Sequence, residues 1–97
     1  MKLRYTLPAL ADLDSILDYI ASVSPQGAKR VQKRVHEVVN LLLSHPKIGI
    51  PTDDPVIRRL TTPPYPFLIF YEIAEDEIIV HAIRHTARDP SSMPGST

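Results

Sequence analysis

Cysteine and tryptophan are both absent from this chain of 97 residues, and only three glycines are present. The lack of cysteine excludes a disulfide framework and thiolate metal sites, and it fits a reducing compartment, for which the cytoplasm is the default. No glycine-rich loop that could cradle a phosphate is present either. Little besides a basic cluster near the C-terminus is left to carry chemistry.

Long apolar runs and an excess of charge of either sign are also absent. No run approaches the roughly 20 residues of a membrane span, and the N-terminus lacks the apolar region of a signal peptide. We therefore expect a soluble, cytoplasmic protein without a membrane partner. The 11 basic and 11 acidic residues cancel, so no global field attracts nucleic acid. A chain of this length predicts one domain with a single core.

Two amphipathic helices are predicted in the first half of the chain. Thr6 and Pro8 are typical of a helix start, and Ser24 with Pro25 forms an N-cap and first-turn pair that opens the second helix. Apolar residues recur at steps of three and four in both helices: Leu10, Leu13, Leu17 and Ile20, then Val31, Val35, Val38 and Leu42. The second helix should end near residues 44–46. Two narrow apolar stripes predict an antiparallel helix hairpin that packs on a sheet.

Runs of β-branched and aromatic residues predict the strands. One short run precedes the helices (residues 3–6), and three follow them (residues 56–60, 67–73 and 78–84), the last two joined as a hairpin. Residues 46–55, with three prolines, a glycine and two aspartates, are expected to form a loop. The order of strand, helix, helix and three strands predicts an α+β fold with an antiparallel sheet.

The run at residues 67–73 is apolar on both faces. Because side chains alternate along a strand, Phe67, Ile69 and Tyr71 point one way. Leu68 and Phe70 point the other way, and two helices can cover only one face of such a sheet. The second face either meets a partner or belongs to a central strand that is simply apolar all round.

A basic cluster, formed by Arg84, His85 and Arg88, ends the last strand. These side chains could bind phosphate or an acidic patch on a partner, or they could form a solvated strand end. By parity, His81 and His85 are expected on the same face of the strand. No third or fourth ligand is placed beside them by spacing, so no metal and no cofactor is predicted.

Further basic residues lie on an earlier strand and on the second helix. Arg58 and Arg59 alternate faces, so one of them could pair with Glu72 or Asp89. Four basic residues of the second helix, at positions 29, 30, 33 and 34, lie off its apolar stripe and predict a solvated face.

Several segments in the same order resemble the ParE branch of the RelE/ParE toxins of type II toxin–antitoxin modules. They are ADL (11–13), ILDYIA (16–21), LSHPKIG (43–49), RL (59–60), FYEI (70–73) and HTARDP (85–90). The resemblance runs from about residue 3 to residue 90. It implies a helix hairpin on a mostly antiparallel sheet, in one toxin domain over residues 1–90. Residues 91–97 are small and polar and are expected to form a disordered tail, because they cannot bury enough apolar surface to become ordered.

The resemblance also implies partners. ParE-like toxins act on DNA gyrase, stalling it with the DNA cut, and are not themselves catalysts. A co-encoded antitoxin neutralises them in a hetero-oligomeric complex, in which its disordered arm folds onto the toxin and any DNA contact is made by the antitoxin. The residues expected to contact the antitoxin are Leu13, Ile16, Tyr19, Ile20, Leu68 and Phe70. Those expected to contact the target are Arg58, Arg59, Arg84, His85 and Arg88.

Two alternatives remain open. The RelE-like branch cleaves mRNA on the ribosome, which requires a base, an acid and fixed cations near one point. Arg88 would then stabilise phosphate and His85 would act as the base. However, Leu68 stands where the mRNA-cleaving relatives carry an arginine, which argues against this activity. The other alternative is a non-toxic module that binds its partner and represses its own operon.

Overall fold

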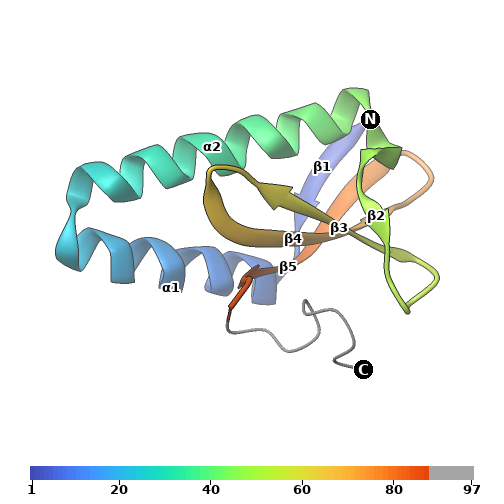
Figure 1. The fold of residues 1–97 in the computed structure, drawn as a ribbon. Coiled ribbons are helices and arrows are strands. Elements are labelled where there is room, and N and C mark those ends of the chain that lie inside the picture. Colours follow the sequence, from blue (N-terminus) through green and yellow to red (C-terminus); the bar gives the residue numbers. More distant parts are fainter. Residues whose placement is uncertain (88–97) are drawn as a thin grey trace.

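The computed structural model describes residues 1–87, which form an α+β fold with one sheet (Figure 1). Strand β1 (Lys2–Tyr5) precedes the helices α1 (Leu7–Val23) and α2 (Pro25–Ser44). A 3-10 turn, η1 (Pro46–Ile48), leads into four strands: β2 (Ile50–Pro51), β3 (Ile57–Thr62), β4 (Tyr65–Ile73) and β5 (Glu77–His85). The predicted α+β class and the order of a strand, two helices and antiparallel strands are confirmed.

The sheet has five strands in the order β1-β5-β4-β3-β2. Strand β1 runs parallel to β5, and the other neighbouring strands are antiparallel. Strand β2 lies inside the segment 46–55, so the prediction of a loop is wrong for Ile50 and Pro51, which pair with Arg59 and Arg58. Proline cannot donate to a strand ladder, but an edge strand tolerates it because its outer side needs no partner.

A single residue separates the two helices. Ser24 donates its N–H to the carbonyl oxygen of Ile20 (2.7 Å), and its hydroxyl accepts the N–H of Gly27 (2.9 Å). Ser24 therefore ends α1 and caps α2, as predicted, with Pro25 in the first turn. This short connection makes the helices an antiparallel hairpin. No helix within residues 1–87 has the length and apolarity needed to cross a membrane.

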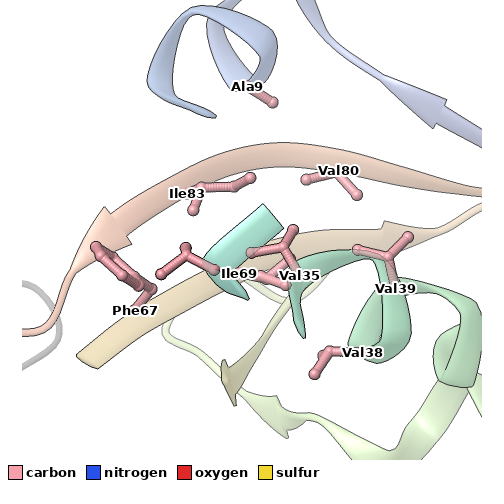
Figure 2. Packing of buried hydrophobic residues seen from close by; sticks show 9 residues of the cluster. Ala9, Val35, Val38, Val39, Phe67, Ile69, Val80 and Ile83 are labelled. Carbon is pink, nitrogen blue, oxygen red and sulfur yellow. The ribbon is translucent and has the colours of Figure 1, made fainter. Parts of the chain in front are cut away.

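The core lies between α2 and one face of the sheet (Figure 2). Val35 and Val39 of α2 pack in one buried cluster with Ile69 of β4 and Val80 of β5. The buried residues of α2 confirm its predicted apolar stripe: Val31, Val35, Val38, Val39 and Leu42. Helix α1 contributes only Ala9 to the buried set, so much of its apolar surface stays accessible.

No helix of the described chain covers the other face of the sheet, which we call the open face. Leu68 and Phe70 of β4 point to it, yet Leu68 is only 4% exposed and Phe70 is half-buried. This favours a central strand that is apolar all round. The alternative, a bare apolar face awaiting a partner, does not hold at Leu68.

Candidate functional site

The helix hairpin extends beyond the ends of the strands (Figure 1). A groove is lined by side chains of both the hairpin and the strand ends. The groove has a volume of about 560 Å³. Both helices, the start of β4 and the end of β5 contribute side chains, most of them apolar or aromatic. The lining residues are Ser15, Ile16, Tyr19, Ile20, Gly27, Val31, Tyr65, Pro66, Phe67 and His85.

Three of the residues predicted to contact an antitoxin line this groove: Ile16, Tyr19 and Ile20. Tyr19 is 64% exposed, so its ring is accessible from outside. Leu13 instead packs against the core from α1. Since Leu68 and Phe70 point to the open face, the predicted set is divided between two surfaces.

The end of β5 is likewise divided between the two faces. His85 lies in the groove, where its ring meets Phe67 edge to face at a centroid distance of 5.5 Å. Arg84 is aligned with Leu68 on the open face, and its Nε lies 3.5 Å from Oδ2 of Asp12. The same carboxylate oxygen accepts the N–H of Ile83 (3.0 Å). Arg88, also predicted to contact the target, lies outside the described residues.

Asp12 matters because β1 pairs with only the first half of β5. The register of β1 ends at Val80, so the outer edge of β5 continues without a neighbouring strand. Asp12 of α1 supplies the acceptor that Ile83 would otherwise lack on this edge, and it also orients Arg84. The sequence gives no signal for this role, because it shows only that Asp12 lies off the apolar stripe of its helix.

Arg58 has a structural task near the opposite end of β4, where it is aligned with Tyr71. Its guanidinium donates to the carbonyl oxygens of Gly49 (2.8 Å) and Lys47 (3.4 Å). Of the two carboxylates suggested as partners for one of Arg58 and Arg59, Glu72 binds His81 and Asp89 lies outside the described residues. Arg59 is aligned with Phe70 and shares the open face with Arg84.

The buried Tyr71 completes the attachment of the loop. Its hydroxyl donates to the carbonyl oxygen of Pro46 (2.7 Å) and accepts the N–H of Gly49 (3.0 Å). Burial raises the pKa of Tyr71 above its ordinary value of 10.0, although the Gly49 N–H and the charge of Arg58 act in the opposite direction. The Tyr71 and Arg58 bonds together hold the segment that carries β2.

Glu72 binds His81 instead, with 2.8 Å between Oε1 and Nε2. The prediction that His81 and His85 share a face is wrong. In β5, Ala82 is aligned with Phe70 but Val80 with Tyr71, so a bulge at His81 reverses the alternation. Within residues 1–87, no group of three histidine and acidic side chains is placed to hold a metal ion.

The basic residues of α2 agree with the predicted solvated face, with one exception. Lys29, Arg30 and Lys33 are exposed. Arg34 is half-buried and donates through Nε to the carbonyl oxygen of Pro63, at a distance of 2.7 Å. This bond ties the middle of α2 to the turn between β3 and β4.

Comparison with known proteins agrees with this architecture. Residues 3–90 match the family described as ParE toxin of type II toxin-antitoxin system, parDE. Toxin RelE2 of Caulobacter vibrioides is 34% identical over 84 residues, which cover 87% of this chain and 93% of that protein. The solved structure of a chromosomal ParDE TA system from P. aeruginosa is 31% identical and superposes with a TM-score of 0.76, covering 88% of this chain and 95% of that chain.

The family match spans almost the whole of the described chain, and it includes both helices and all five strands. The relative and the solved structure agree with it at more than 30% identity. The chain therefore belongs to the ParE family of toxins of type II toxin–antitoxin systems.

Proposed function

We propose that this toxin inhibits DNA gyrase by binding it, without catalysing a reaction of its own, and that a co-encoded antitoxin neutralises the toxin by covering the groove. The first part rests on the resemblance to the ParE branch, whose members act on gyrase, and the chain matches the ParE toxin family over residues 3–90. The division of the basic residues supports it further. A metal-free ribonuclease needs its base, acid and cations near one point, whereas His85 lies in the groove and Arg84 on the open face.

The proposed contact surface for gyrase is the open face at the end of β5. Arg59 and Arg84 both reach this face, and the Arg84 side chain is 52% exposed despite its ion pair with Asp12. A guanidinium in this position can bind a carboxylate on a partner with two parallel hydrogen bonds. Arg58 would contribute indirectly, by holding the loop beside β3.

The groove is the observation that carries the second part of the proposal. Tyr19 is 64% exposed and Val23, four residues later on the same side of α1, is 79% exposed. An apolar surface of this kind is a common partner-binding feature. We assign it to an apolar segment of the antitoxin. Arg30 is exposed three residues after Gly27 on α2, so an acidic residue beside the apolar segment would complement the rim.

Toxin freed from its antitoxin should be tested in gyrase supercoiling and cleavage assays beside a ribosome-programmed mRNA cleavage assay. Linear DNA should accumulate while the mRNA stays intact. The variant Arg84→Ala should need about fivefold more toxin for the same effect, because it loses a contact to the target. Lys33→Ala, which removes an exposed cation from α2 away from both surfaces, is the matched control. Normal supercoiling at saturating wild-type toxin would refute gyrase as the target.

One observation favours mRNA cleavage as a second candidate. Glu72 holds the imidazole of His81, and Glu72 lies on the open face, two residues from Phe70, the partner of Arg59. A carboxylate that orients a histidine on the same face of the sheet as an arginine is a combination suited to proton transfer near a phosphate. Cut mRNA in the assay above, lost in His81→Gln, would establish this candidate instead.

A further inference from the structure

His85 has a fixed position in the wall of the groove. Its ring stands at 88° to that of Phe67, with 5.5 Å between the ring centroids. This edge-to-face contact is a favourable arrangement of two aromatic rings. The backbone after β5 adds a second restraint, because the N–H of Ala87 donates to Nδ1 of His85 (3.1 Å). Two contacts thus hold the imidazole in place.

The bond from Ala87 also determines the tautomer. A ring nitrogen that accepts a hydrogen bond carries no proton, so the neutral ring carries its proton on Nε2. Within the described residues Nε2 has no protein partner. Every buried side-chain nitrogen and oxygen of these residues has a hydrogen-bond partner. Because Nε2 has none, it is not buried and is accessible to water. The Nε2–H group is therefore an oriented donor at the groove.

The other polar groups that line the groove differ from it. Ser15, Tyr19 and Tyr65 contribute hydroxyl groups, which rotate and both donate and accept. The imidazole is held by its contacts and offers a donor in one direction. A segment that enters the groove and expels water must supply an acceptor at this point, since an unsatisfied donor weakens binding.

We propose that His85 sets the register of the antitoxin segment in the groove, through a hydrogen bond from its Nε2–H to a carbonyl or carboxylate oxygen of an otherwise apolar segment. This inference rests on the proposed function, because it takes the antitoxin as the occupant. It gives His85 a place in antitoxin recognition, whereas the sequence suggested contact with the target.

The test compares the affinity of the co-encoded antitoxin for the wild-type toxin and three variants by titration calorimetry. His85→Phe keeps an aromatic ring beside Phe67 but removes the donor, and its Kd should rise about tenfold to a hundredfold. His85→Gln restores an N–H near the position of Nε2 and should recover part of the loss. His36→Phe makes the same change at an exposed site on α2 and should bind like the wild type. Thermal unfolding of each variant confirms that it is folded.

The outcomes separate the inference from the proposed function. If the wild type binds the antitoxin and His85→Phe binds it equally well, the register role is wrong while the antitoxin proposal stands. If the folded wild type does not bind the antitoxin at all, both are wrong. Nitrogen NMR of the wild-type histidines adds a second readout: His85 should be protonated on Nε2 in the free toxin, and its Nε2 resonance should shift on binding. Protonation on Nδ1 in the free toxin would overturn the inference.

Discussion

Single residues fix the loop that leads into β2, and Gly49 shows why side-chain size matters there. A Cβ added at Gly49 would overlap the Tyr71 hydroxyl and would lie 2.8 Å from the backbone oxygen of Arg59. That hydroxyl bonds to both Pro46 and Gly49, so it has little freedom to move away. The glycine is needed for this close approach.

Gly49→Ala should therefore lower the free energy of unfolding by about 1–3 kcal/mol, the usual effect of forcing extra volume into a packed site. Urea unfolding measures it. Gly27→Ala is the control. Its Cβ would lie 3.1 Å from a side-chain atom, Ser24 Oγ, and not against a backbone oxygen. Gly27 also lies in a helix, where alanine is preferred to glycine. Equal stability of Gly49→Ala and the wild type would contradict the close approach.

The buried phenol of Tyr71 makes stability depend on alkaline pH. Because burial raises its pKa in the folded chain, the unfolded chain loses this proton first as the pH rises. At pH values below 10.0, the ordinary pKa of tyrosine, this group should not change the free energy of unfolding. Above that pH the free energy of unfolding should fall. Tyr71→Phe should weaken that fall. Urea unfolding repeated across the alkaline range measures this difference.

At the scale of elements, α1 and β5 depend on each other through Asp12. Its carboxylate accepts the N–H of Ile83, where β1 no longer covers the edge of β5, and it pairs with Arg84. The two contacts differ in value. An exposed ion pair contributes only about 0–1 kcal/mol, whereas a backbone N–H on a partly buried edge needs an acceptor.

Substitution of Asp12 separates these contacts. Asp12→Asn keeps an oxygen for Ile83 and should lower the free energy of unfolding by less than about 1 kcal/mol. Asp12→Ala removes both contacts and should lower it by about 1–2 kcal/mol. Asp14→Ala, an exposed site in the same helix, serves as the control in urea unfolding. An equal effect of the two Asp12 variants would mean that the ion pair, and not the edge bond, matters.

The elements differ in how far the sequence predicts them. The helices and main strands follow from apolar spacing and from Ser24 and Thr6, whose capping chemistry is local. Strand β2 was missed because the three prolines of residues 46–55 are typical of a loop, and the strand exists only by pairing with β3. The bulge at His81 depends on register between β4 and β5, which no local pattern encodes. The division of Arg84 and His85 between two faces follows instead from the local alternation of side chains along β5.

At the scale of the whole molecule, the helix hairpin extends beyond the sheet (Figure 1). The groove is lined by residues of both helices, the start of β4 and the end of β5. The sequence predicted Ile16, Tyr19 and Ile20 as a partner surface, and the structure brings them together in this groove. The sequence could not predict that Tyr65, Phe67 and His85 line the groove from the side of the sheet. Their position depends on where β4 and β5 end relative to the hairpin. Leu68 and Phe70 were included in the same predicted set because the sequence does not show that they lie on the open face. Their burial there depends on tertiary structure.

The central claim is that the antitoxin occupies this groove. Hydrogen–deuterium exchange of the toxin, alone and in complex with the co-encoded antitoxin, tests it most directly. Protection should increase along residues 15–31 and 65–67, the segments that line the groove. Protection confined to β3 and the open face of β4, with residues 15–31 unchanged, would contradict the claim.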